Sequence, residues 1–156
     1  MTATALDFSF ELNPKFRYTS RVHWDELDPL QMLHNSRFAA HVERAVIAFY
    51  ESAGYRWTMT VSENPDQFHV VRDFHIEFLA PVARPGDLHV EIWVEHLGTT
   101  SCIYGFRCTS QDGAITHARG NRTIIKLDPE TKRPAAWTDS FQRVHREIRK
   151  DLPAAP

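Results

Sequence analysis

The chain is poor in cysteine, and Cys102 and Cys108 are the only two. They stand six positions apart in a stretch with the composition of one strand, where an extended backbone separates them by about 20 Å. A disulfide needs Cα atoms less than about 7 Å apart, so these thiols cannot bridge one another. Free thiols are typical of a reducing compartment, and we therefore expect a cytoplasmic protein.

An excess of one charge is also missing, since 18 basic residues stand against 20 acidic ones and the formal net charge is −2. The basic residues are dispersed, which indicates no surface for nucleic acid or for an anionic membrane. No run of about 18 apolar residues could cross a bilayer, and the N-terminus lacks the pattern of a signal peptide. We expect neither a nucleic-acid partner nor a membrane association.

Metal-binding motifs are absent from the sequence as well. The nine histidines form no HExxH motif, and the two cysteines lack the spacing of zinc ligands. We therefore expect no metal.

The length and composition that remain are those of one globular domain. The chain has 156 residues, of which 42% are hydrophobic and 24% charged, and no internal repeat or linker divides it. We expect a single domain over residues 1–156, with its core at about residues 16–137.

Hydrophobic periodicity predicts one strand followed by one long helix. Alternation indicates a half-buried strand over residues 16–24, and Pro29 then predicts a turn. Asn35 or Ser36 can cap the helix that follows. Its apolar stripe, at spacings of three and four, consists of Phe38, Val42, Ala45, Val46 and Phe49. Gly54 stands where a helix end favours a left-handed residue.

The second half of the chain has the pattern of an antiparallel sheet. Residues 55–69 read as a loop whose Trp57, Met59 and Phe68 could contact a ligand. Runs rich in β-branched and aromatic residues then predict strands at 70–79, 87–96, 101–110 and 114–127. Short connections indicate that successive strands pair as antiparallel neighbours. A terminal helix at about residues 139–150 completes an α+β order, and the uncovered sheet edge or face favours self-association.

Three stretches in this order resemble the hotdog-fold thioesterases of the 4-hydroxybenzoyl-CoA thioesterase type. They are DPLQMLHNSRF at residues 28–38, FHIEFLAP followed by PGD at residues 74–87, and GTTS at residues 98–101. The resemblance implies a long central helix wrapped by a curved antiparallel β-sheet of about five strands. It also implies a homodimer or homotetramer with sites at the subunit interface, which hydrolyses an acyl-CoA or acyl-carrier-protein thioester. Coenzyme A then enters only as part of the substrate, and no cofactor is expected.

The same resemblance assigns roles to residues at the start of the helix. Asp28 matches the catalytic aspartate, and Asn35 matches the residue whose backbone amide binds the thioester oxygen. Aspartate side chains are ordinarily ionised at neutral pH, so Asp28 can attack the thioester or activate a water. The residues alone also allow a purely structural Asp-Pro turn. Gln31 and Met32 are further candidate substrate contacts. They replace the Gly-His pair of many relatives, and glycine there would permit unusual backbone dihedrals and close substrate approach.

Other candidates have weaker support. Glu43 is a rival catalytic carboxylate, as in another branch of these thioesterases, but its helical angle favours a solvated or interfacial charge. His34 could hydrogen-bond a carboxylate or the substrate, and the helix face beginning at Phe38 suggests an apolar pocket. Thr100 and Ser101 could touch the pantetheine arm, although turn chemistry explains them equally well.

Four arginines, Arg84, Arg107, Arg119 and Arg122, are of the type that meets nucleotide phosphates at a pocket mouth, although surface solubility explains any one of them better. We therefore assign none of them a phosphate contact.

The leading functional hypothesis is an acyl-CoA thioesterase. A non-catalytic hotdog protein that binds an acyl thioester or a hydrophobic ligand is the alternative, which the replacement at Gln31 and Met32 keeps open. A hotdog dehydratase or hydratase ranks last, because its usual histidine and acid pattern is not visible in the equivalent region.

Overall fold

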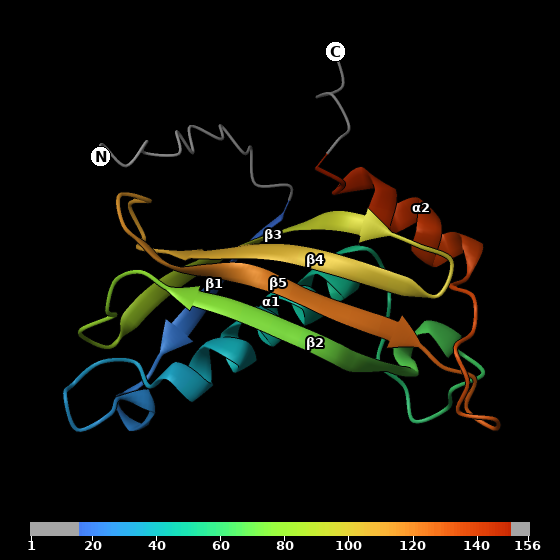
Figure 1. Ribbon diagram of the computed structural model, residues 1–156, viewed down its shortest axis with the longest axis horizontal. Helices are drawn as coiled ribbons and strands as arrows, with labels where there is room; N and C mark the ends of the chain where they lie inside the picture. The colour runs from blue at the N-terminus through green and yellow to red at the C-terminus, as the bar shows by residue number, and fades with distance from the viewer. Residues whose placement is uncertain (1–15, 151–156) are drawn as a thin grey trace, which may run out of the picture.

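The computed structural model describes residues 16–150, which form a curved five-stranded sheet and two α-helices (Figure 1). The elements are β1 (Phe16–Val22), α1 (Phe38–Ser52), β2 (His69–Phe78), β3 (Gly86–Leu97), β4 (Ser101–Thr109), β5 (Thr116–Lys126) and α2 (Asp139–Glu147). Short 3-10 turns lie at Trp24–Glu26, Asn35–Arg37 and Pro65–Gln67. The predicted α+β class and the wrapped central helix are confirmed. None of the helices in residues 16–150 is long and apolar enough to span a membrane.

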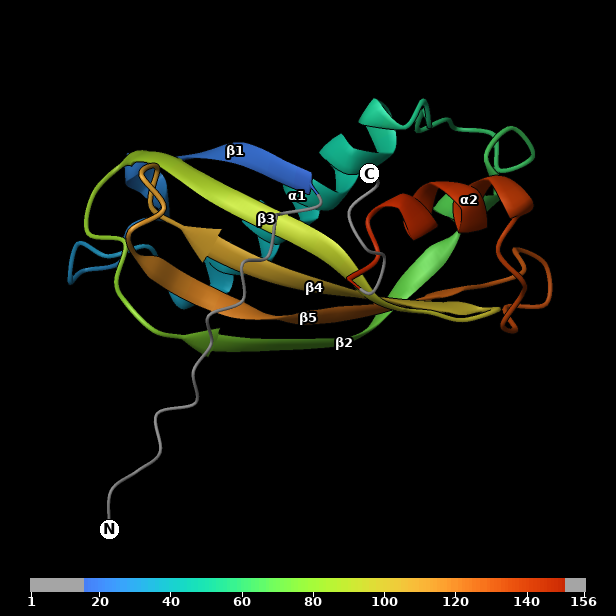
Figure 2. The same cartoon turned by 90° about the horizontal axis from the view of Figure 1, so that it is seen from above.

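The strand order is β1-β3-β4-β5-β2, with every neighbouring pair antiparallel (Figure 2). The expectation that all successive strands pair is therefore wrong for β2 and β3. After Phe78 the chain crosses the end of the sheet and enters β3 beside β1, while β2 pairs with β5 at the edge. Seven residues reach across three strand spacings of about 4.8 Å each, so a short connection does not require neighbours.

The helix prediction is confirmed by burial. All five residues of the predicted stripe are less than 6% exposed, and they pack on the sheet face formed by side chains such as Val90, Tyr104 and Phe106. Gly54 has φ +85°, as expected at the end of a helix. The start of the helix differs from the prediction, because α1 begins at Phe38 after a 3-10 turn over Asn35–Arg37. The side chain of His34, not of Asn35 or Ser36, accepts the hydrogen bond that caps this turn.

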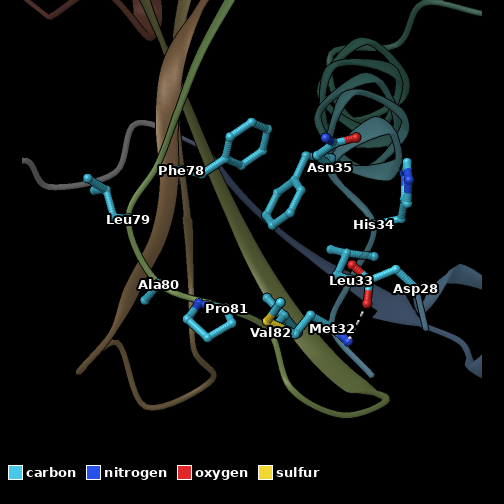
Figure 3. Close-up of a pocket in the computed structure, with 11 residues that line it drawn as sticks. Asp28, Met32, Leu33, His34, Asn35, Phe78, Leu79, Ala80, Pro81 and Val82 are labelled. Atoms are coloured by element: carbon cyan, nitrogen blue, oxygen red, sulfur yellow. Dashed lines mark hydrogen bonds between the residues drawn. The ribbon is translucent and has the colours of Figure 1, made fainter. Parts of the chain in front are cut away.

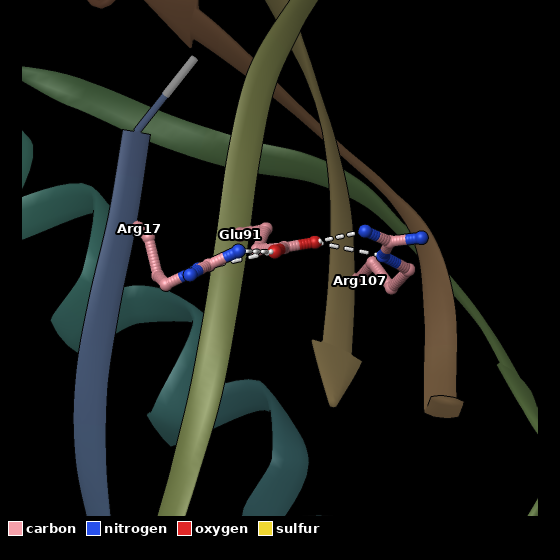
Figure 4. A network of polar contacts seen from close by, with 3 residues as sticks. All are labelled: Arg17, Glu91 and Arg107. Carbon is pink, nitrogen blue, oxygen red and sulfur yellow. Dashed lines mark hydrogen bonds and ion pairs between the residues drawn. The ribbon is translucent and has the colours of Figure 1, made fainter. Parts of the chain in front are cut away.

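The outer face of the sheet, which α1 does not cover, contains a charge network (Figure 4). The Glu91 side chain on β3 is 3% exposed and lies between two guanidinium groups. One of its oxygens is 2.7 Å from Arg17 Nη2, and the other accepts a 2.7 Å hydrogen bond from Arg107 Nε. Two cations thus offset the cost of burying this carboxylate.

Both cysteines are buried, free thiols on β4, which confirms that part of the expectation. Burial raises the pKa of both groups, that of Cys108 to about 12. A neutral buried thiol is a poor nucleophile, so neither cysteine is a candidate for covalent chemistry.

A buried hydrogen-bond chain links α1, β4 and α2 at the end of the sheet near the β3–β4 turn. The Tyr50 and Tyr104 hydroxyls lie 3.2 Å apart, and the Tyr104 hydroxyl is 2.6 Å from Nε2 of His145. His145 Nδ1 is 2.8 Å from the Phe141 carbonyl, which can only accept. His145 therefore carries its proton on Nδ1, and Tyr104 donates to Nε2.

The buried histidines, His145 of this network among them, lead us to expect a loss of stability in mild acid. Burial lowers the pKa of His145 to about 4, and burial also lowers the pKa of His41 and His69. In the unfolded chain a histidine titrates near 6.5, so the unfolded state binds more protons below that pH. The free energy of unfolding should fall between pH 6.5 and 4, with His145 alone accounting for about 3 kcal/mol. Urea unfolding across this range, compared with a His145→Gln variant of shallower pH dependence, measures the effect.

Candidate active site

Asp28 organises the loop that precedes the helix. Its Oδ1 accepts hydrogen bonds from the amides of Leu30 at 2.8 Å and Met32 at 3.2 Å. Its own amide donates to the Met32 carbonyl at 2.8 Å, and its carbonyl accepts from the Gln31 amide at 2.9 Å. The carboxylate is thereby fixed in a tight loop, where it is half-buried and lines a pocket.

The loop places Gln31 in the left-handed region, with φ +62°. The family resemblance implies glycine at this position, and Gln31 adopts the glycine-like conformation nonetheless. A residue with a Cβ adopts this conformation at a cost of roughly 1–2 kcal/mol, partly offset because glycine loses more entropy on folding.

We therefore expect Gln31→Gly to stabilise the protein by about 0.5–1 kcal/mol. Gly54→Ala is the converse control. Gly54 also has a positive φ, and an added Cβ there would meet open space, so that substitution should cost a similar amount through strain alone. Denaturant midpoints of the two variants test both signs, and an unchanged midpoint for Gln31→Gly would show that the loop bears no strain.

The start of the helix offers a free backbone donor. His34 Nδ1 accepts from the Ser36 amide at 3.2 Å, and the His34 carbonyl accepts from the Arg37 amide at 2.9 Å. Within residues 16–150 the amide of Asn35, between them, donates to no acceptor. Amides at the start of a helix carry partial positive charge and attract anionic groups.

Asp28 and Asn35 line the same pocket, whose volume is about 380 Å³ (Figure 3). Asp28, His34 and Asn35 form one side of it, and the segment from Phe78 to Val82 forms the other. The full lining is Asp28, Met32, Leu33, His34, Asn35, Phe38, Phe78, Leu79, Ala80, Pro81 and Val82. The predicted contacts Met32, His34 and Phe38 thus come together with Asp28 and Asn35, in a largely apolar pocket.

The opposite wall was not identified in the sequence as part of a site. The Leu33 amide donates to the Val82 carbonyl at 2.9 Å, which holds the wall to the loop. The rings of Phe38 and Phe78 meet edge to face, with centroids 5.4 Å apart. In the sequence, residues 78–81 (FLAP) read only as the end of a strand. Their apolar run before a proline is the one local signal that could have indicated a pocket wall.

A buried polar network ties the loop to α1 and β1. Glu26 accepts a hydrogen bond from the His23 amide, and its Oε1 lies 3.2 Å from Nε2 of His41, without the alignment of a hydrogen bond. The Ser20 hydroxyl is 2.6 Å from Nδ1 of His41. Serine, histidine and glutamate follow the order of a hydrolase triad, but Ser20 is only 1% exposed and cannot reach a substrate. The network therefore supports the loop.

Glu43 lies outside this pocket. It accepts a 3.0 Å hydrogen bond from Nη2 of Arg122, and its side chain is 55% exposed. The two residues line a second pocket of about 200 Å³, together with Val46, Ile47, Tyr50, Trp57 and His69. The structure thus separates the two candidate carboxylates into different pockets.

Thr100 and Ser101 lie at the other end of the sheet. Ser101 is level with Ile125 on β5, whereas Phe78 of the first pocket is level with Ala118. The Thr100 carbonyl accepts from the Lys126 amide, and the Ser101 carbonyl accepts from the Gly98 amide. A single chain therefore does not bring these two residues to Asp28, and their substrate contact stays a prediction.

The remaining candidates are distributed over other surfaces. Met59 is fully exposed, and Phe68 packs under Lys132, whose Nζ is 4.6 Å from the ring centroid. Arg107 pairs with Glu91, and Arg119 pairs with Glu77. Within residues 16–150 no three histidine, cysteine or acidic side chains are grouped so that they could hold a metal ion.

Solved structures share this fold at low sequence identity. A 1,4-dihydroxy-2-naphthoyl-CoA thioesterase from Synechocystis is 14% identical, with a TM-score of 0.74 over 88% of this chain and 98% of that one. A thioesterase from Thermus thermophilus, complexed with coenzyme A and zinc, is 22% identical, with a TM-score of 0.71 over 90% and 97%. A Staphylococcus aureus DHNA-CoA thioesterase is 14% identical, with a TM-score of 0.73 over 85% and 89%. No curated protein sequence matches this chain.

The fold and the pocket thus define a hotdog-fold protein with a carboxylate and a free helix-start amide in one apolar site. The sequence profile of the thioesterase-like superfamily matches residues 22–144, and the chain belongs to that superfamily.

Proposed function

We propose that the protein is an acyl-CoA thioesterase, in which Asp28 and the Asn35 amide act on a thioester bound in the first pocket. The observation that carries the proposal is that these two groups line one largely apolar pocket, and that the Asn35 amide has no other acceptor within residues 16–150. The apolar lining suits an acyl group, and the thioesterase with bound coenzyme A among the structural neighbours supports the choice of thioester.

Each group has a definite part in the proposed hydrolysis. The Asp28 carboxylate takes a proton from water, whose oxygen attacks the carbonyl carbon, or it attacks that carbon itself to form an anhydride that water then cleaves. In either case negative charge develops on the carbonyl oxygen, and the Asn35 amide donates to it. The carbon–sulfur bond breaks, and coenzyme A leaves as a thiol with a free acid as the other product.

A second copy of the chain is expected to complete the site. β2 is a ten-residue edge strand, and along it and just after it Val70, Val71, Phe78 and Leu79 are 46–50% exposed. Phe78 and Leu79 also line the first pocket, so a subunit paired along this edge would extend the pocket walls. We therefore propose a homodimer or homotetramer.

One observation favours a second candidate function, binding of an acyl thioester without turnover. Asp28 Oδ1 already accepts two loop hydrogen bonds, which is the structural role open to an Asp-Pro turn. In that case the Asp28 carboxylate would only stabilise the loop and would take no part in a reaction.

Thiol release from short, long and aromatic acyl-CoAs, and from acyl-carrier-protein thioesters, separates the two functions. A thioesterase should turn over at least one class, with oligomeric state measured in parallel by light scattering. Saturable binding of the same thioesters with no thiol release on any of them would favour the binding protein and reject the enzyme.

A further inference from the structure

The second pocket contains a buried cation that its surroundings only partly satisfy. Arg122 is 6% exposed, and its Nε is buried without a hydrogen-bond partner. A guanidinium has five N–H donors, and within residues 16–150 the hydrogen bond to Glu43 is the one that this group makes. Burying a guanidinium is costly unless its donors are paired, so the pocket has unused capacity to bind an acceptor.

Glu43 is the solvent-exposed partner of the ion pair. Its side chain is 55% exposed, whereas that of Arg122 is 7% exposed. An exposed carboxylate can rotate into water at small cost, since exposed ion pairs contribute about 0–1 kcal/mol. The arginine is thus the fixed partner, and the carboxylate of Glu43 occupies a place that a ligand carboxylate could take.

The rest of the pocket is uncharged. Val46 and Ile47 provide apolar surface, and the Tyr50 and Trp57 rings meet edge to face at 5.5 Å. His69 Nδ1 donates to the Asp66 carbonyl, and burial lowers the pKa of His69, so its ring is neutral at pH 7. Arg122 is therefore the only cation among the lining residues, and the pocket suits an apolar stem that ends in an anion.

Helix geometry places the two pockets in line. Asn35 and Glu43 are eight residues apart, and the α-helical positions 39 and 43 lie one turn apart on the same face. A rise of about 2 Å per residue in the 3-10 turn Asn35–Arg37 and about 1.5 Å per residue in α1 separates Asn35 and Glu43 by about 13 Å along the axis. Phe78 of the first pocket and Phe74, opposite Arg122, are four residues apart on β2, which corresponds to about 13 Å. The small Ala39 lies in the first turn of α1, one turn before Glu43.

We infer that the acyl group carries a terminal carboxylate, which Arg122 binds while the thioester lies between Asp28 and Asn35. The substrates are then ω-carboxyacyl-CoA thioesters of medium length, with Glu43 displaced from Nη2 when the ligand binds. This inference rests on the proposed function for the position of the thioester, and it adds the chemical class of the acyl group.

Matched pairs of acyl-CoAs test the inference. The wild type should have a kcat/KM at least tenfold higher for suberoyl- or sebacoyl-CoA than for the octanoyl or decanoyl partner of the same length. Arg122→Met should abolish that ratio. Glu43→Gln should raise the ratio, because it removes the competing carboxylate. Glu51→Gln, an exposed acid at the far end of the same helix, is the control and should leave the ratio unchanged.

A binding measurement tests the inference about the acyl group independently of the proposed catalysis. Calorimetry with ω-carboxyalkyl and plain alkyl thioethers of coenzyme A measures the same preference without any hydrolysis. A preference in binding that Arg122→Met removes supports the site even if no thioester is cleaved. If Arg122→Met does not fold, the opposite shift with Glu43→Gln decides. Equal affinities for both thioethers at every length, or a ratio that neither variant changes, would overturn the inference and leave the thioesterase proposal standing.

Discussion

Asp28→Asn should reduce kcat by about 10² to 10⁴, with little change in stability. General acid or base action by a positioned side chain has this magnitude, and an asparagine amide can neither accept the proton nor attack the carbonyl. The substitution preserves the loop, because the asparagine Oδ1 can still accept from the amides of Leu30 and Met32. A purely structural Asp28 would therefore tolerate the change. Thiol release under single-turnover conditions, with urea midpoints measured alongside, distinguishes the two roles.

Asp25→Asn is the matched control for this variant. Asp25 is an exposed carboxylate three residues earlier in the chain, in the 3-10 turn Trp24–Glu26, and does not line the pocket. Its loss should leave kcat within about twofold, because an exposed charge outside the site is worth little. Glu43→Gln tests the rival acid on the same uncharged thioesters. A collapse of kcat there, together with undiminished turnover by Asp28→Asn, would transfer the catalytic role to Glu43.

The parts of the molecule that sequence reasoning predicted are those governed by local periodicity. The stripe from Phe38 to Phe49 repeats every three or four residues because one helix face must be buried, and that signal is contained in the stretch itself. The four later strands were located for the same reason, with ends correct to within two residues. Turn chemistry similarly indicated Gly54 and the loop at Asp28.

Long-range pairing was not predictable in this way. Periodicity reports which face of a strand is buried, but not which strand lies beside it, so the edge position of β2 was missed. The ion pair of Glu43 and Arg122 joins residues 79 positions apart, and neither residue has a local pattern that indicates the other. The wall formed by Phe78 and Val82 reaches the loop only through the crossing at the end of the sheet.

Asn35→Pro should reduce kcat by about 10² to 10³, which corresponds to about 2.7–4 kcal/mol for one lost oxyanion donor. Proline removes the backbone N–H and leaves the rest of the site in place. The position tolerates it, because Asn35 is the first residue of its turn and His34 before it is extended, with φ −61° and ψ 137°. No hydrogen bond within residues 16–150 is lost, since the amide has no acceptor there.

Asn35→Ala separates the amide from the side chain. It retains the N–H, so its kcat should stay near that of the wild type, whereas an equal loss in both variants would assign the effect to the carboxamide. The affinity for an acyl thioether of coenzyme A should change little in either variant, because the oxyanion exists only after attack on the carbonyl. If Asn35→Pro folds and turns over thioesters within about threefold of the wild type, the charge on the carbonyl oxygen must be stabilised elsewhere. The free amide at the start of the helix would then have no part in the chemistry.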